Sequence, residues 1–138
     1  MNIRRIPIAT IGVIRLDLPV VTVGRGQPVV SIITGLHGGE ESGVLVLRDL
    51  MRALGSKITG TLRIFPAGNP LTQAFKQRSS PLDNINPNRA FPGSDEGVVS
   101  GRIAALTLKA MAGSDLVIDL HCFSQDCVFT GVLVSNGD

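Results

Sequence analysis

The sequence predicts an α/β fold in which helices flank a mixed sheet that is parallel at its centre. The run 29–34 does not alternate polar and apolar residues and is typical of a strand buried on both faces, 116–120 is predicted as another buried strand, and 61–65 as a further strand. Segments with helical spacing of apolar residues lie between them, and this alternation of strand and helix favours parallel pairing. With 138 residues, 43% of them hydrophobic and 17% charged, the chain is expected to form one domain, 1–138.

The first 25 residues contain short β-branched runs at 11–16 and 20–23, separated by Pro19 and Gly24. These runs predict antiparallel strands or a hairpin at the edge of the sheet. An amphipathic helix is predicted from about 39 to 54, and Gly55 is its expected stop. Its apolar residues fall at i, i+3, i+6, i+7 and i+10 and are expected to pack on the sheet: Val44, Leu47, Leu50, Met51 and Leu54.

The second half of the chain alternates in the same way. A short helix is predicted at 71–76, and a longer one at 98–111 with Ile103, Leu106 and Ala110 on one face and Gly113 as its stop. Between them, 78–97 is rich in proline and glycine, and so long a loop inside a compact domain is usually functional. A last strand is predicted at 127–134. Its free edge would invite pairing with a second copy of the chain, so a homo-oligomer is expected there.

Composition excludes several classes of protein. A net charge of +2, no Trp or Tyr and five Phe argue against nucleic-acid binding. No apolar run reaches the 18 or so residues of a membrane span, and 1–14 lacks the cleavage site of a signal peptide. Cys122 and Cys127 are too few for a disulfide framework, which favours a cytoplasmic protein.

His37 and Glu40 lie where the predicted strand 29–34 gives way to a helix, and His121 ends the predicted strand 116–120. Since parallel strands end at the same edge of a sheet, the three side chains can meet there. Two histidines and one glutamate form a recognised zinc-binding set that leaves a position open for water. Asp119, two residues before His121, could back one of the histidines or hold substrate.

Other interpretations of these residues are possible. A histidine at a strand end is often only hydrogen-bonded, and a glycine-rich strand–helix turn can also bind phosphate. Against phosphate, Glu40 and Glu41 would place two negative charges at the helix N-terminus, and no Lys-Ser/Thr pair follows the glycines. Cys122 lies next to His121 but would point to the opposite face of the strand, so a buried structural thiol is expected.

Three segments of the chain together resemble the N-terminal part of the succinylglutamate desuccinylase/aspartoacylase family, relatives of the zinc carboxypeptidases. The first is Gly35-Leu36-His37-Gly38-Gly39-Glu40. The second comprises Asn69-Pro70, Arg78 and Asn88-Arg89-Ala90-Phe91-Pro92-Gly93, and the third is Asp119-Leu120-His121. The resemblance covers roughly 20–130 and implies a zinc carboxypeptidase-like fold that is incomplete at its C-terminus.

The resemblance also implies roles for individual residues. His37, Glu40 and His121 would bind one zinc ion per chain. Arg78 would polarise the scissile carbonyl or hold the substrate, while Asn88 and Arg89 would bind the carboxylate of an N-acyl amino acid or a related compound. The side-chain chemistry agrees, because a guanidinium pairs with a carboxylate through two charge-assisted hydrogen bonds.

The family's general base is a glutamate in its later half, and none of the glutamates here matches it. Glu40 is used as a ligand, Glu41 is rotated about 100° from it around the helix, and Glu96 lies in a glycine-flanked loop. Asp95, Asp115 and Asp126 match no motif of the family. Asn86-Pro87 also replaces the family's usual Asp-Leu.

Two functions therefore remain open: a deacylase-type amide hydrolase of which this chain carries the metal site, or a non-catalytic metal- or carboxylate-binding domain. A purely structural domain is a third.

Overall fold

The computed structural model describes residues 1–54, 58–122 and 130–134. Its core is a mixed six-stranded sheet with the order β1-β2-β4-β3-β5-β6. The strands are β1 (Asn2–Ile11), β2 (Ile14–Arg25), β3 (Val29–Thr34), β4 (Gly60–Phe65), β5 (Leu116–His121) and β6 (Thr130–Val134). The helices are α1 (Glu41–Ala53), α2 (Pro70–Phe75) and α3 (Val99–Met111), with a short 3-10 helix η1 (Pro87–Arg89).

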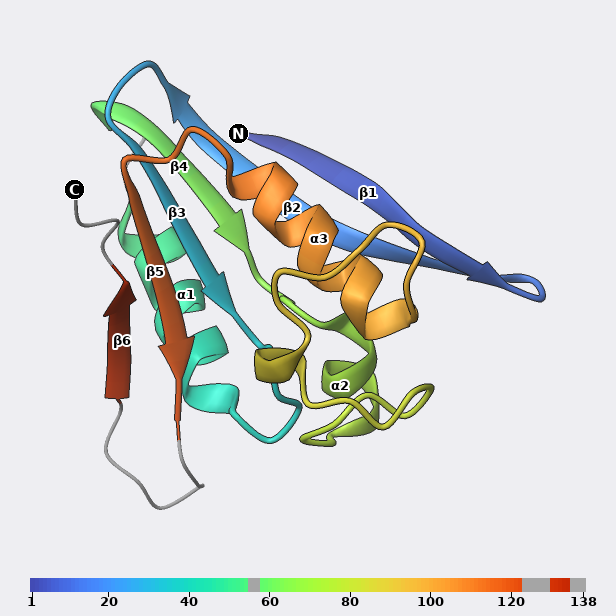
Figure 1. The fold of residues 1–138 in the computed structure, drawn as a ribbon. Helices are drawn as coiled ribbons and strands as arrows, with labels where there is room; N and C mark the ends of the chain where they lie inside the picture. The colour runs from blue at the N-terminus through green and yellow to red at the C-terminus, as the bar shows by residue number, and fades with distance from the viewer. Residues whose placement is uncertain (55–57, 123–129, 135–138) are drawn as a thin grey trace.

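The three central strands are parallel, as predicted. β3 pairs with β4 on one side and with β5 on the other, and the arrows of all three run the same way in Figure 1. β2 and β6 pair antiparallel with the outer members of this group, and β1 pairs antiparallel with β2. The carboxyl ends of β3 and β5 therefore lie at the same edge of the sheet, where open α/β sheets bind their ligands.

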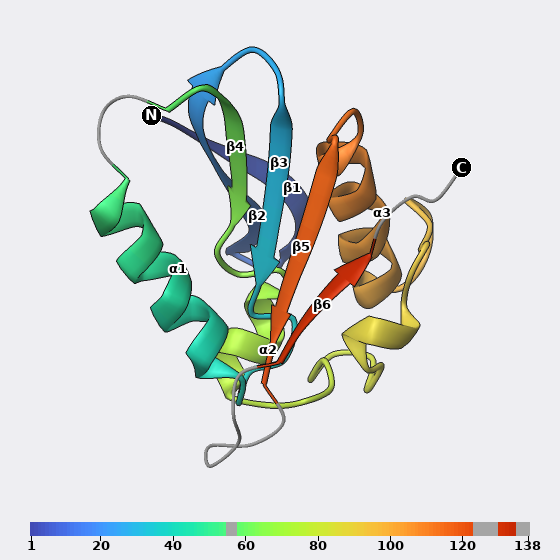
Figure 2. The ribbon, with the colours of Figure 1, turned by 90° about the vertical axis from the view of Figure 1, so that its left-hand side faces the viewer.

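Successive residues of β3 point into two different apolar layers, because side chains alternate across a strand. Ile32 packs with Leu47 of α1 and Ile64 of β4, whereas Ile33 joins Phe65 and Ile103 of α3 on the opposite face. Figure 2 shows α1 and α3 on opposite sides of the sheet. The prediction that β3 is buried on both faces, and that both long helices pack on the sheet, is confirmed.

The N-terminal hairpin differs from the prediction in its boundaries. The run 11–16 is not one strand, because Gly12, at φ 58°, and Val13 form the turn between β1 and β2. Pro19 does not end a strand either but lies within β2. β2 pairs with β4 only through residues 21–25, so the proline occupies a stretch with a single partner strand, where a missing donor is tolerated.

The loop that joins α2 to α3 is attached to the rest of the fold by Asp83. Its carboxylate accepts the backbone N–H of Ser100 at 2.7 Å and the hydroxyl of the same residue at 2.8 Å. Burial acts to raise the pKa of Asp83, but the hydrogen bonds from Ser100 and Ile85 outweigh it and lower the pKa below its usual value. Asp83 thus satisfies an N–H that the first turn of α3 cannot pair internally.

The remaining boundaries agree closely with the predicted ones. The long helices begin at Glu41 and Val99, within one or two residues of expectation. Gly55, the predicted stop of the first helix, and Cys127, the predicted start of the last strand, lie outside the described residues. β6 has one partner strand in the described part of the chain, so the pairing of its other edge with a second chain stays a prediction. None of the described helices combines the length and the apolar character needed to span a membrane.

Candidate metal centre

The turn between β3 and α1 carries His37 and Glu40 and is held by the segment around α2. Gly38 donates its N–H to the carbonyl of Gln77 at 2.8 Å, and the side chain of Gln73 donates to the carbonyl of His37 at 2.7 Å. A Cβ added to Gly38 would lie only 1.8 Å from the carbonyl oxygen of Thr72. Only glycine fits this close approach of two backbones.

The three predicted metal ligands converge at the carboxyl ends of β3 and β5. Ligand atoms from His37, Glu40 and His121 all lie within 4.8 Å of one another. His37 Nδ1 is 2.8 Å from Glu40 Oε1, and His121 Nδ1 is 2.7 Å from Glu40 Oε2. His37 is 2% exposed and Glu40 7%, so the cluster is buried apart from the edge of His121.

The second ring nitrogen of each imidazole, Nε2, lies within hydrogen-bonding distance of a side chain outside the cluster. His37 Nε2 lies 2.9 Å from Asn86 Oδ1, and His121 Nε2 lies 2.9 Å from Asp119 Oδ2. The role of Asp119 as a backing group agrees with the prediction, whereas Asn86 was noted in the sequence only as a departure from a motif. Such partners orient metal-binding imidazoles and select the nitrogen that faces the ion.

Glu40 is the common partner of the cluster. Besides the two histidines, its carboxylate accepts the backbone N–H of Cys122 at 3.1 Å and meets Arg78 Nη1 at 3.3 Å. The side chain of Cys122 is buried, as predicted. Cys122 contacts the cluster through its backbone N–H, which donates to Glu40. The structure therefore brings Arg78, which the motif singled out, beside the metal ligands.

The pKa of His121 is raised, and the hydrogen bond to Asp119 is the largest cause. Burial acts in the opposite direction, and the charge of Asp119 and the contact with Glu40 add to the increase. The two flanking carboxylates, Asp119 and Glu40, thus stabilise the protonated imidazole of His121. A proton and a metal ion would compete for the lone pair of His121 Nδ1.

The residues present fit a bound metal ion. His37 Nδ1 is buried and lies 2.8 Å from Glu40 Oε1, but among the described residues it makes no hydrogen bond with a suitable angle. An unpartnered buried nitrogen is costly, and a cation at the centre of the cluster would satisfy it. Two imidazole nitrogens and a carboxylate form a ligand set that suits zinc.

The two other predicted substrate-binding residues lie on η1. Asn88 and Arg89 are exposed, and the backbone N–H of Asn88 donates to Asn86 Oδ1 at 3.0 Å. Asn86 therefore links the turn that carries Asn88 and Arg89 to His37. The structure thus connects η1 through Asn86 to His37, one of the candidate metal ligands.

The acidic residues considered as a general base lie elsewhere in the described part of the chain. Glu41 forms an exposed ion pair with Lys76, and Asp95 forms one with Lys109. Asp115 accepts the N–H of Val29 at the opposite end of β3. Glu96 is exposed in the loop before α3, and Asp126 lies outside the described residues.

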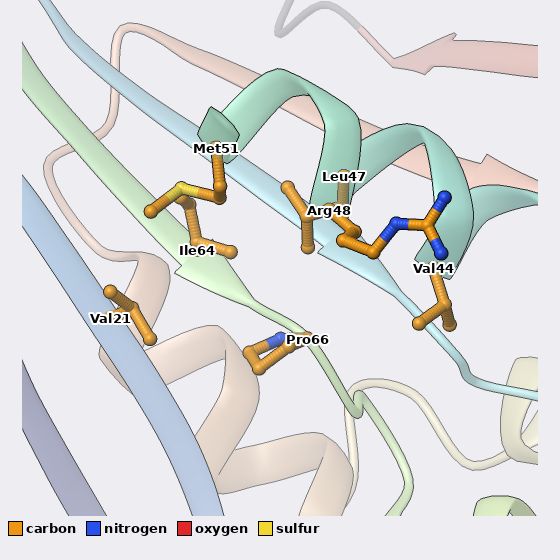
Figure 3. Close-up of a pocket in the computed structure, with 7 residues that line it drawn as sticks. All are labelled: Val21, Val44, Leu47, Arg48, Met51, Ile64 and Pro66. Carbon is orange, nitrogen blue, oxygen red and sulfur yellow. The ribbon is translucent and has the colours of Figure 1, made fainter. Parts of the chain in front are cut away.

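A separate apolar hollow of about 170 Å³ lies between α1 and the sheet. Figure 3 shows its lining, which is apolar apart from one arginine: Val21, Val44, Leu47, Arg48, Met51, Ile64 and Pro66. None of the cluster residues lines it. Arg48 is the single polar side chain in this lining, which offers little to orient a polar substrate, and the sequence motifs meet elsewhere.

Residues 26–136 match the model of the succinylglutamate desuccinylase/aspartoacylase catalytic domain. The chain belongs to this family. N-alpha-acetyl-L-2,4-diaminobutyric acid deacetylase from Halomonas elongata is 36% identical over 107 residues, which cover 75% of this chain and 31% of that protein.

Two solved structures illustrate the likeness of this family member in three dimensions. A succinylglutamate desuccinylase from Silicibacter sp. TM1040 is 30% identical with a TM-score of 0.72, over 80% of this chain and 35% of that one. The product-bound ectoine utilization protein EutE from Ruegeria pomeroyi is 30% identical with a TM-score of 0.69, over 76% of this chain and 33% of that one. The chain thus spans about a third of the length of these relatives.

Proposed function

We propose that the chain forms the metal-binding part of a zinc-dependent hydrolase that cleaves the amide bond of an N-acyl amino acid or a similar carboxylate-bearing substrate. The observation that carries this proposal is the buried convergence of His37, Glu40 and His121 in a member of this family. The names of two relatives support the substrate class, since one deacetylates an N-acetyl diamino acid and the other removes succinyl from succinylglutamate.

His37, Glu40 and His121 would hold the ion through two nitrogens and a carboxylate. When bound, zinc would supply Lewis acidity toward the acyl carbonyl and lower the pKa of water. Arg78 Nη1 lies 3.3 Å from Glu40, and because the Arg78 side chain is 62% exposed its guanidinium has room to turn toward a substrate. Its positive charge would stabilise negative charge that develops on the carbonyl oxygen.

Substrate orientation is assigned to Asn88 and Arg89 on η1. Both are exposed, and a guanidinium beside an amide can bind a free carboxylate through several hydrogen bonds at once. Because Asn86 joins η1 to His37, a carboxylate held there would be bound close to the metal ligands. Such a fixed orientation is what brings an amide bond into reach of the reacting groups.

The metal site is tested by comparing two adjacent glutamates. Isothermal titration calorimetry with zinc should give one ion per chain. Glu40→Gln should lower affinity by more than the roughly 10–100-fold that loss of an outer-shell partner costs. Glu41→Gln makes the same chemical change one residue away, at a surface ion pair with Lys76, and should bind zinc as the unaltered chain does. Equal affinities for the two variants, or no binding by the unaltered chain, would refute the site.

A second candidate is a domain that binds zinc and a carboxylate ligand without hydrolysing it. It is favoured by the positions of Glu41, Glu96, Asp95 and Asp115, none of which contacts the cluster in the described part of the chain. Incubating the zinc-loaded chain with N-acetyl amino acids and measuring released acetate separates the two functions. We expect negligible release, and sustained zinc-dependent turnover would favour the hydrolase over the binding domain.

A further inference from the structure

The turn that carries His37 and Glu40 is hydrogen-bonded to two side chains of α2. The hydroxyl of Thr72 donates to the carbonyl of Leu36 at 2.7 Å, and the amide of Gln73 donates to the carbonyl of His37 at 2.7 Å. Gln73 thus contacts the turn at the backbone of a candidate metal ligand. We infer that Gln73 is a positioning residue, whose amide fixes the turn from which His37 and Glu40 extend and so sets the spacing of these two ligands.

The orientation of the Gln73 amide follows from its partner. The oxygen and nitrogen of an amide are hard to tell apart by shape, so their assignment depends on their surroundings. A backbone carbonyl can only accept, so the atom of Gln73 that meets His37 must be the nitrogen. Gly35 allows this approach, because a Cβ there would crowd the amide carbon of Gln73 at 3.0 Å. The amide therefore packs against the start of the turn while it donates to His37.

Both polar groups of the peptide unit between His37 and Gly38 are bonded to the segment around α2. The carbonyl accepts from Gln73, and the N–H donates to the carbonyl of Gln77 at 2.8 Å. Because a peptide unit is planar, holding both of its polar groups restricts ψ of His37 and φ of Gly38 together. Glycine otherwise has wide backbone freedom, so a restraint matters most where Gly38 and Gly39 follow each other.

The carbonyl of His37 also closes the turn. It accepts the backbone N–H of Glu40 at 3.3 Å, which is the three-residue spacing of a β-turn. Since a carbonyl oxygen has two lone pairs, this one atom can join both ligand residues to Gln73. Within the turn, His37 Nδ1 and Glu40 Oε1 lie 2.8 Å apart. Without the Gln73 donor the turn would stay closed but could shift against α2, and the two ligands would lose their alignment with His121.

Thr72 provides a comparison that separates positioning from general support of the fold. Its side chain is fully buried and its hydrogen bond is equally short, but its acceptor, Leu36, precedes the turn that the His37 carbonyl closes. Thr72→Val and Gln73→Met each remove one such hydrogen bond and should cost comparable stability. Only Gln73→Met should alter the geometry of the metal site.

The first test is amide hydrogen exchange of the metal-free chain, followed by NMR at the N–H groups of Gly38 and Glu40. Both should exchange about five- to tenfold faster in Gln73→Met than in the unaltered chain, because one hydrogen bond no longer restrains the turn. Gln27→Met makes the same change at an exposed residue before β3 and should leave both rates unchanged. Rates in Gln73→Met that do not exceed those in Thr72→Val overturn the inference. If Gln73→Met does not fold, Gln73→Glu, which keeps the shape of the side chain and replaces the donor by an acceptor, decides by the same rates.

The second test uses cobalt(II) in place of zinc and rests on the proposed function. The visible absorption of bound cobalt depends on its coordination geometry, which a loss of stability alone does not change. Gln73→Met should shift this spectrum and lower the affinity for the ion about tenfold, whereas Thr72→Val and Gln27→Met should keep the spectrum of the unaltered chain. A spectrum of Gln73→Met identical to theirs overturns the inference. An unaltered chain that binds neither zinc nor cobalt would refute the proposed function, while the exchange rates would still decide the role of Gln73.

Discussion

Gly38 and Gly39 are adjacent in the turn between His37 and Glu40, but the structure predicts opposite results for replacing them with alanine. A Cβ at Gly38 would lie 1.8 Å from the carbonyl oxygen of Thr72 and 2.6 Å from the backbone nitrogen of Gln77. A Cβ at Gly39 would meet nothing within 4 Å. Neither glycine has a positive φ, so the contrast comes from packing and not from backbone conformation.

The cost of Gly38→Ala follows from these contacts. The turn must move by more than 1 Å to reach an ordinary contact distance, and both obstacles are backbone atoms that cannot turn aside. Forcing a group into a packed site costs about 1–3 kcal/mol, and the hydrogen bond from Gly38 to Gln77 contributes about 1 kcal/mol more. We therefore expect Gly38→Ala to lower the free energy of unfolding by about 2–4 kcal/mol.

Thermal and urea unfolding of the metal-free chain provide the measurement. At about 3 °C per kcal/mol for a domain of this size, Gly38→Ala should lower Tm by about 6–12 °C, whereas Gly39→Ala should shift it by less than about 2 °C. Zinc affinity should fall in Gly38→Ala as well, since His37 is carried on the displaced turn. Equal stability of the two alanine variants would refute the close packing of this turn against α2.

Two further predictions concern other parts of the chain. Asp83→Asn should destabilise the protein by about 1–2 kcal/mol near neutral pH, measured by urea unfolding. The pKa of Asp83 in the folded protein is lower than its ordinary value of 3.8. Its carboxylate therefore stabilises the fold above pH 3.8, and this stabilisation is lost as pH falls through the folded pKa. The free energies of unfolding of the unaltered chain and of Asp83→Asn should therefore converge below pH 3.8. Arg89→Ala should weaken binding of N-acetyl amino acids by about 1.5–3 kcal/mol, as measured by calorimetry.

The Arg89 prediction has a matched control on α1. Arg52 is exposed, lies in the last turn of that helix and pairs only with Asp49 among the described residues. Arg52→Ala removes the same charge and should leave ligand binding unchanged. An affinity that does not differ between Arg89→Ala and Arg52→Ala would remove Arg89 from the carboxylate site.

Sequence reasoning predicted the central strands and the convergence of His37, Glu40 and His121 because both depend on strong local signals. β3 is mostly apolar and does not alternate, and His37 and His121 each follow a predicted strand whose parallel pairing brings them together. The role of Arg78 toward substrate stays a prediction of the motif, and the structure adds that its guanidinium lies 3.3 Å from Glu40. These features follow from periodicity, strand direction and residue type.

What the sequence could not predict depends on contacts between distant segments. Gly38 and Gly39 look equivalent in the chain, and only the approach of Thr72 distinguishes them. Asn86 resembled a simple departure from a motif, and its role depends on a hydrogen bond across 49 residues. Likewise, the turn at Gly12 falls inside an apolar run because the length of the hairpin is set by its pairing and not by its hydrophobic pattern.

The ligands of the cluster also define an order of assembly. His37 and Glu40 are neighbours in the chain, but His121 lies 81 residues beyond Glu40 and reaches them only when β5 has paired with β3. Contacts between residues so far apart in the sequence generally form more slowly than local ones. Zinc should therefore bind weakly to the unfolded chain and tightly only after the central strands have joined. Uptake of the ion would then report that the parallel core is complete, and the bound ion would resist its opening.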